Sequence, residues 1–417
     1  MLNESQKPAS STMPAQRRQP LSAMDQRIRK AALHRLRDIR LGCVSIIDDQ
    51  AEYILGDPRD ELQAQVTVND HRFWRMLASG GSLGAGEAYM HGLWDSPDLT
   101  AVVRVLARNR EVLPELIRQS WLQRKLMQWW HARNRNSVQG SRRNISAHYD
   151  LSNDFFRLWL DQGMNYSSAW FDPQQDAAAM TLEAAQLAKL ERICTRLNVR
   201  PGDKIMEIGC GWGDFALHAA AQHGCEVTAT TISAAQFDVV KQRIDAAGLQ
   251  HRIHLIMTDY RELPGQFDHV VSIEMIEAVG HHYVDGYFAK IDSLLKPKGQ
   301  ALIQAITIED QRYEQALHNV DFIKRYIFPG SFIPGLARLR QSIHAAGMET
   351  LEAFDIGLSY ARTLMHWRQR FCARLDDIRA LGFDEQFLRM WLYYFAYCEG
   401  GFAERAISDV QLHLRKA

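Results

Sequence analysis

The chain has 417 residues, with 49 basic and 49 acidic side chains and therefore no net formal charge at pH 7. That length exceeds one ordinary domain core, so we expect two domains, or one domain with a large cap. The balanced charge excludes a global attraction to nucleic acid and leaves only local basic patches as sites for polyanions.

The cysteines and the N-terminal residues bear on the cellular compartment. The six cysteines form no CxxC pair and no metal-ligand spacing, so we expect reduced thiols in a cytoplasmic protein and no metal site. The first twenty residues contain no apolar signal segment, and no run of 18 apolar residues occurs anywhere. We therefore expect neither a signal peptide nor a spanning helix, and any lipid would be met from the inner face of the membrane.

Composition divides the first part of the chain into three segments. Residues 1–24 are rich in Ser, Pro, Gln and Arg and are predicted to be a disordered tail. Residues 25–115 mix helical and strand patterns and are predicted to be a domain. Residues 116–145 contain no acidic residue but several arginines and three tryptophans. This segment is either a solvated linker helix or a surface segment that lies on anionic lipid headgroups.

From residue 182 onward, helical and strand patterns alternate. A predicted helix at 182–197 precedes strands at 204–208, 225–232, 253–259, 268–275 and 300–308, with helices between the first three. Such alternation predicts a doubly wound, mainly parallel sheet with a Rossmann-like fold. From about residue 331 to the end, amphipathic helices rich in aromatic residues are expected, notably at 387–402.

A glycine loop follows the first strand of this predicted sheet. The sequence "MEIGCGWG" places Glu207, Gly209, Gly211 and Gly213 between a strand and a helix, where missing Cβ atoms let a nucleotide approach the backbone. The spacing differs from the dinucleotide pattern GxGxxG. An acidic residue that closes the strand suits the cationic cofactor S-adenosylmethionine better than a pyrophosphate.

Two later strand ends provide further candidate cofactor contacts. The second strand ends in "TTISAAQ", without the usual acidic ribose ligand, and offers Thr231, Ile232 and Gln236 instead. The third ends in "TDYREL", where Asp259 and Tyr260 stand at the usual adenine position and an aromatic ring can stack on the base.

Six ordered motifs resemble one enzyme family. They are "HYDLSNDFFRLWLDQGMNYSSAWF", "MEIGCGWGDFALHAA", "TTISAAQ", "VSIEMIEAVG", "YIFPG" and "TLMHWRQRF". Together they resemble the cyclopropane-fatty-acyl-phospholipid synthase family, which also includes mycolic acid cyclopropane synthases and fatty-acid C-methyltransferases. The resemblance runs from about residue 78 to the C-terminus. It implies a class I S-adenosylmethionine-dependent methyltransferase domain at 146–417, with helical acyl-site insertions, behind a smaller α+β lipid-binding domain at 25–115.

The resemblance also implies a reaction. The methyl group is transferred to a cis double bond of a phospholipid acyl chain, and the resulting cation loses a proton and closes to a ring. In the family a bound bicarbonate is the base. Carried over by motif, its ligands correspond to Glu277, Ile306 and Tyr360, together with Ser168 and Gln304. The last two stand where the family has Cys and His, which leaves open whether bicarbonate is retained. Tyr166 and Ser167 correspond to contacts of the methionine part of the cofactor.

Several alternatives remain open at this point. Glu274 stands where many ring-forming members have Gly; it is either an ordinary strand-end carboxylate or part of a retuned pocket. The product is accordingly a cyclopropane, or a methyl- or methylene-branched chain from a related C-methyltransferase. A non-catalytic lipid-binding relative is a third hypothesis, disfavoured by the intact glycine loop. The late aromatic helix is either core or the wall of an acyl tunnel, and Cys398 within it is expected to be a small buried hydrophobe. Expected partners are unsaturated phospholipid chains at the membrane surface and no nucleic acid; a homodimer is left open.

Overall fold

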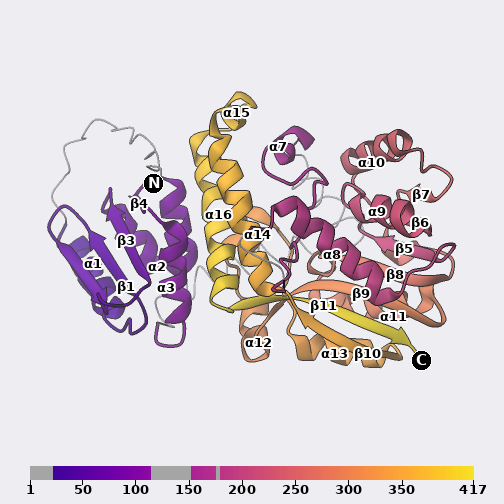
Figure 1. The fold of residues 1–417 in the computed structure, drawn as a ribbon. Helices are drawn as coiled ribbons and strands as arrows, with labels where there is room; N and C mark the ends of the chain where they lie inside the picture. The colour runs from indigo at the N-terminus through magenta and orange to yellow at the C-terminus, as the bar shows by residue number, and fades with distance from the viewer. Residues whose placement is uncertain (1–21, 114–151, 175–178) are drawn as a thin grey trace.

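A computed structural model describes residues 22–113, 152–174 and 179–417 of the chain (Figure 1). The predicted basic segment at 116–145 lies outside these residues, as do residues 1–21 of the predicted tail. The first helix already begins at Ala23, capped by the Ser22 side chain, which accepts a hydrogen bond from the backbone N–H of Asp25. The tail is therefore predicted slightly too long at its C-terminal end.

The N-terminal domain is a small α+β unit. Its four-stranded sheet has the order β2-β1-β3-β4, with β1 antiparallel to β2 and parallel to β3. Apolar residues at alternate positions of β3 face the helices, as expected for a sheet covered on one side. The elements are α1 (Ala23–Leu36), β1 (Cys43–Ile47), β2 (Glu52–Gly56), β3 (Gln63–Val68), α2 (Arg72–Met90), β4 (Trp94–Asp95) and α3 (Leu99–Arg108).

The C-terminal domain is built on a seven-stranded sheet of order β10-β11-β9-β8-β5-β6-β7. The five strands from β9 to β7 are parallel to their neighbours, while β11 is antiparallel to both β9 and β10. The strands are β5 (Lys204–Ile208), β6 (Glu226–Thr230), β7 (Ile253–Ile256), β8 (Phe267–Ile273), β9 (Leu295–Ile308), β10 (Met348–Asp355) and β11 (Ile407–Lys416). The predicted doubly wound sheet is thus confirmed.

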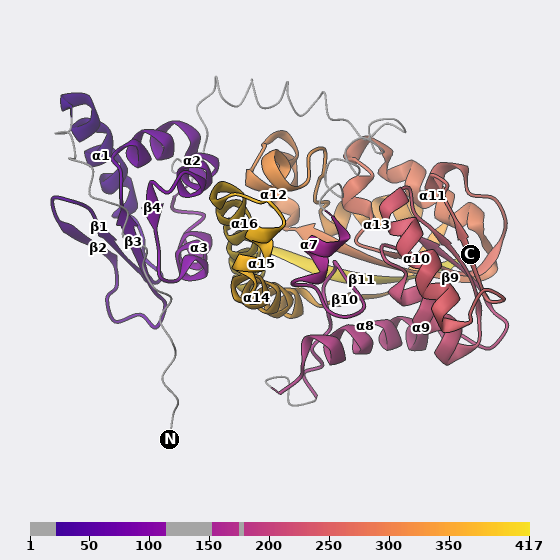
Figure 2. The same ribbon diagram turned by 90° about the horizontal axis from the view of Figure 1, so that it is seen from above.

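Helices cover both faces of this sheet. Figure 2 shows α8 and α9 on one face and α11 and α13 on the other. The helices are α7 (Asn153–Arg157), α8 (Leu182–Leu197), α9 (Asp214–His223), α10 (Ala234–Ala247), α11 (Val284–Leu294), α12 (Asp310–His318), α13 (Leu336–Ala345), α14 (Gly357–Ala373), α15 (Leu375–Ala380) and α16 (Glu385–Ala403). Short helical turns are η1 (Tyr260–Glu262), η2 (Ile276–Ala278), η3 (His281–Tyr283) and η4 (Ile323–Ile327).

The expectation of helices alone after residue 331 is wrong. Strands β10 and β11 complete one edge of the sheet, and every second residue of β10 is less exposed than its neighbours. The alternation in "METLEAFD" and "SDVQLHLRK" has the period of two that marks a half-buried strand. This alternation is much weaker than the aromatic pattern of α16, which is why the two strands were not predicted.

Helix α16 of the C-terminal domain forms the contact with the N-terminal domain. It packs against α2 and α3 of the N-terminal domain on one side and against α14 on the other (Figure 1). At its C-terminal end Glu404 accepts hydrogen bonds from Arg104 and Arg108 of α3, at 2.6 and 2.7 Å. Arg389 donates to the carbonyl of Trp94 at 2.9 Å. Within the described ranges no helix is both long and apolar enough to cross a membrane.

Candidate active site

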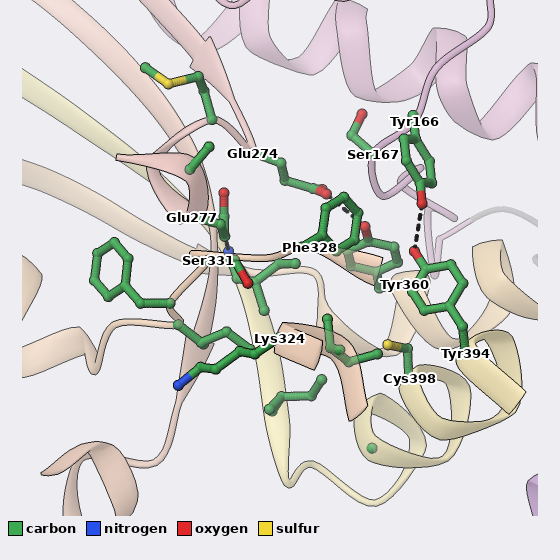
Figure 3. A pocket seen from close by; sticks show the side chains of 18 of the residues that line it. Tyr166, Ser167, Glu274, Glu277, Lys324, Phe328, Ser331, Tyr360, Tyr394 and Cys398 are labelled. Atoms are coloured by element: carbon green, nitrogen blue, oxygen red, sulfur yellow. Dashed lines mark hydrogen bonds between the residues drawn. The ribbon is translucent and has the colours of Figure 1, made fainter. Parts of the chain in front are cut away.

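One cavity of about 900 Å³ lies above the carboxyl ends of the parallel strands, where ligands bind in open α/β sheets. Its lining runs from the glycine loop after β5 past the ends of β8 and β9 to the faces of α14 and α16. Figure 3 shows the part that includes Glu274, Glu277 and Tyr360. Leu77, Leu106 and Ala107 show that the N-terminal domain also contributes to its lining. A cofactor and a long apolar substrate can therefore share this space.

The glycine loop has the backbone that a nucleotide site needs. Gly209 and Gly211 adopt φ angles of +80° and +53°, and both line the cavity. A Cβ atom at Gly209 would lie 2.8 Å from Cγ of Met275, so a larger residue would displace that side chain. Gly213, at φ +84°, is the residue before α9 and is not among those that line the cavity. Its role is to start the helix.

Glu207, the acidic residue before this loop, has a carboxyl oxygen that could pair with a cation. Oε2 of Glu207 is buried and has no hydrogen-bond partner among the described residues. Burial raises the pKa of Glu207 to about 8, and nearby Asp214 acts in the same direction. A bound cation would satisfy this orphaned oxygen, and S-adenosylmethionine carries an ammonium and a sulfonium. The residues present therefore fit that cofactor.

The other predicted cofactor residues also line this cavity; they are Tyr166, Ser167, Thr231, Ile232, Gln236, Asp259 and Tyr260. The Thr231 hydroxyl donates to Oε1 of Gln236 at 2.9 Å, which leaves the amide NH₂ of Gln236 to face a ligand. Asp259 caps η1, where its carboxylate accepts from the N–H of Arg261 at 3.1 Å. The ring of Tyr260 stands edge-on to Tyr287 at 5.4 Å.

The strip 163–168 is held against α8 by a buried lysine. Lys189 is fully buried, and its ammonium donates to the hydroxyl of Ser167 at 2.9 Å. Burial lowers the pKa of Lys189. Tyr166 reaches the far wall, where its hydroxyl donates to that of Tyr394 at 3.1 Å (Figure 3). Sequence reasoning missed Lys189, although Lys189 and Gln186 are polar residues on the buried stripe of α8.

Glu277 faces the cavity from η2. Its Oε1 accepts a hydrogen bond from the backbone N–H of Ile306 at 2.6 Å, while its Oε2 is buried without a partner among the described residues. Burial, reinforced by the neighbouring carboxylate of Glu274, raises the pKa of Glu277 to about 8. The structure thus brings together Glu277 and Ile306, two of the predicted anion ligands.

The other three predicted anion ligands converge on Glu274. Its Oε1 accepts from the backbone N–H of Ser168 at 2.7 Å and from Nε2 of Gln304 at 2.8 Å. Its Oε2 accepts from the hydroxyl of Tyr360 at 2.7 Å (Figure 3). Glu274 also lines the cavity, as the alternative of a changed pocket requires.

The expected roles of Ser168 and Gln304 need correction. Neither lines the cavity, and both are fully buried. The Ser168 hydroxyl donates to the carbonyl of Ala169 at 2.8 Å, away from any ligand. The second amide hydrogen of Gln304 goes to Oδ2 of Asp409 at 2.9 Å. Both side-chain donors are therefore engaged within the protein, and an external bicarbonate does not fit the residues present.

The aromatic helix α16 divides between core and cavity wall. Tyr393, Tyr394 and Tyr397 line the cavity, whereas Phe395 is fully buried in the core between Trp159 and Phe371. Cys398 is a partly buried side chain that packs against the core, as expected, but it also lines the cavity. Helical periodicity alone could not separate these faces, because both are apolar.

Fold and site together define a class I S-adenosylmethionine-dependent methyltransferase. The sheet order, the glycine loop at the switch point and the orphaned carboxylate beside it all belong to that class. The adjoining apolar cavity with aromatic walls adds room for an extended carbon chain.

Comparison with known proteins identifies the family. The profile of the family described as mycolic acid cyclopropane synthetase matches residues 136–412, and the chain belongs to this family. It is 40% identical to the tuberculostearic acid methyltransferase UfaA1 of Mycobacterium tuberculosis, over 79% of this chain and 77% of the relative. It is 36% identical to the cyclopropane-fatty-acyl-phospholipid synthase of Escherichia coli K12, over 84% of this chain and 86% of the relative.

A solved structure agrees with this assignment. Mycolic acid cyclopropane synthase CmaA1, complexed with SAH and CTAB, matches with a TM-score of 0.61 and 28% identity. The match covers 66% of this chain and 98% of that one. The chain is accordingly an S-adenosylmethionine-dependent C-methyltransferase, as the motifs indicated.

Proposed function

We propose that this enzyme methylates a cis double bond in an acyl chain of a membrane phospholipid and closes the product to a cyclopropane. The observation that carries the proposal is one continuous cavity, which joins the glycine loop to an aromatic-walled slot and is lined by the acidic side chains of Glu274 and Glu277. Similarity to the Escherichia coli synthase over most of both chains supports it.

The residues of the cavity suit this chemistry. When bound, S-adenosylmethionine supplies an electrophilic methyl group. An alkene is a weak nucleophile that no base can activate, so catalysis must come from positioning, exclusion of water and stabilisation of positive charge. The rings of Tyr360 and Tyr394 and the carboxylate of Glu274 line the place where that charge would develop.

The N-terminal domain is proposed to guide the lipid. Leu77, Leu106 and Ala107 extend the apolar slot beyond the catalytic domain. Arg110 and Arg312 also line the cavity and could neutralise a phosphate headgroup. We infer a protein that works peripherally at the cytoplasmic face of the membrane.

A related C-methyltransferase reaction is the second candidate. It would leave a methyl or methylene branch, depending on which proton the cation loses. The carboxylate of Glu274 inside the expected anion site favours it, as does the identity of 40% with the tuberculostearic acid methyltransferase.

The experiment uses S-adenosylmethionine with a labelled methyl group and phosphatidylglycerol vesicles with cis-monounsaturated chains. Mass spectrometry and NMR of the acyl chains identify the product. A labelled ring methylene supports the synthase, and a labelled methyl or exomethylene group supports the second candidate. No transfer to any unsaturated lipid would contradict both.

A further inference from the structure

Glu274 has a backbone conformation that its residue type disfavours. Its φ of +49° lies in the left-handed region, which glycine adopts without strain but side chains with a Cβ rarely adopt. Strained residues of this kind persist only where the surrounding structure holds them, and they cluster at active sites. The contacts of the Glu274 side chain show what holds it.

That side chain accepts three hydrogen bonds from three separate elements. The donors are the N–H of Ser168 before α8, Nε2 of Gln304 on β9 and the hydroxyl of Tyr360 on α14. The distances of 2.7, 2.8 and 2.7 Å are those of charge-assisted hydrogen bonds. Together they form a built anion site, and the carboxylate within it lines the cavity.

Two other acids, Glu277 and Asp409, and the buried Lys189 interact with Glu274. Burial, reinforced by the neighbouring carboxyl of Glu274, raises the pKa of both acids, to about 8 for Glu277 and well above its ordinary value for Asp409, which also hydrogen-bonds to Glu274. Both therefore hold protons near neutral pH. Burial raises the pKa of Glu274 as well, but its three donors and the ammonium of Lys189 act in the opposite direction.

We propose that Glu274 is the catalytic base of this enzyme and that its tethered carboxylate occupies the anion site, so that no free bicarbonate is needed. A carboxylate and bicarbonate present the same planar pair of oxygens to the surrounding donors. The role of Glu274 as a base rests on the proposed function. The occupation of the anion site by its carboxylate does not depend on that function.

The step balances in atoms and charge. The π electrons of the alkene form the new C–C bond as the methyl carbon loses its bond to sulfur, so the positive charge passes from sulfur to the second alkene carbon. Glu274 then takes one proton and becomes a neutral acid. If the proton comes from the new methyl group, the C–H electron pair closes the ring. If it comes from the neighbouring chain carbon, that pair forms a C=C bond.

Two substitutions and one assay condition test the proposal. In buffer freed of CO₂, the wild-type full-length enzyme should keep its rate, and added bicarbonate should change it less than about twofold. Glu274→Gln keeps the shape but not the base, and its rate should fall by about 100-fold or more. Glu274→Gly vacates the anion site, so millimolar bicarbonate should raise its rate by about tenfold or more, whereas Glu274→Gln should not respond.

A binding measurement separates this inference from the proposed function. NMR with ¹³C-bicarbonate should detect binding to Glu274→Gly and not to the wild type, whether or not any lipid is methylated. Thermal unfolding and S-adenosylmethionine affinity verify that both variants are folded. Binding of bicarbonate to the wild type, or a wild-type rate that depends on it, would overturn the proposal. So would an undiminished rate in Glu274→Gln.

Discussion

The hydroxyl of Tyr360 on α14 lies 2.7 Å from Oε2 of Glu274 at the end of β8. Burial and the neighbouring carboxylate raise the pKa of Tyr360 well above its ordinary value, so the phenol stays protonated and donates. Its ring also stacks on Phe402 at 4.4 Å. Tyr360 thus fixes the carboxylate from one side and belongs to the apolar wall on the other.

Tyr360→Phe should separate these two roles. The ring packing is retained, but one hydrogen bond to a charged group is lost, which is worth about 1.5–3 kcal/mol. We expect kcat to fall by roughly 10- to 100-fold, since each 1.36 kcal/mol is a factor of ten, with little change in S-adenosylmethionine affinity. Release of labelled S-adenosylhomocysteine measures the rate.

Tyr326→Phe is the matched control for this variant. It removes another tyrosine–glutamate hydrogen bond, from Tyr326 to Glu87 at 2.8 Å, and Tyr326 does not line the cavity. Its kcat should stay near that of the wild type. Equal losses in both variants would show that Tyr360 acts only through general stability.

The two elevated acids should make cofactor binding depend on pH. Because burial raises the pKa values of Glu207 and Glu277 to about 8, both carboxyls are neutral at pH 6.5 in the free protein. A cationic ligand favours their ionised forms, so S-adenosylmethionine should bind more tightly as pH rises towards 8 and should release protons on binding below it. Calorimetry in two buffers of different ionisation enthalpy measures that release.

Glu207→Gln should remove part of this proton release, whereas Glu226→Gln should not, because Glu226 is an exposed residue on β6.

The raised pKa values of Glu207 and Glu277 also affect the stability of the fold. Acids with raised pKa values in the folded state stabilise it fully below their unfolded pKa, and that stability is lost as pH rises through about 8. The cofactor-free protein should therefore melt at a lower temperature at pH 9 than at pH 6. Equal melting temperatures at pH 6 and pH 9 would contradict the raised pKa values of Glu207 and Glu277.

The contact between the domains offers a separate prediction. Glu404 is about 10% exposed and pairs with both Arg104 and Arg108, so Glu404→Ala leaves two partly buried guanidinium groups without their carboxylate. We expect a loss of about 1–3 kcal/mol in the free energy of unfolding. Glu385→Ala, which removes an exposed pair with Arg379, should cost about 0–1 kcal/mol. Denaturant titration compares them, and equal losses would contradict a specific role for Glu404.

The sequence predicted the parts of this enzyme that depend on local pattern. The glycine loop and the strand ends at Thr231 and Asp259 lie where alternation and spacing placed them, because parallel strands end on one edge of the sheet. Contacts between distant segments were beyond such reasoning. Nothing local shows that Ser168, Gln304 and Tyr360 turn their donors towards Glu274, since this requires β8, β9 and α14 in their folded register. Asp409 was missed for the same reason, because the strand that carries it went unpredicted.

The N-terminal domain lines one part of the cavity. Ala107 on α3 faces the slot, so Ala107→Trp should fill space that a long acyl chain would need. We expect turnover of vesicles with long unsaturated chains to fall by about tenfold or more, because the double bond can no longer reach its position, while S-adenosylmethionine affinity stays the same. Lys30→Trp adds the same side chain at an exposed position of α1 and should leave turnover unchanged. If Ala107→Trp methylates long chains at the wild-type rate, the acyl chain does not use this part of the cavity, and the guiding role of the N-terminal domain is wrong.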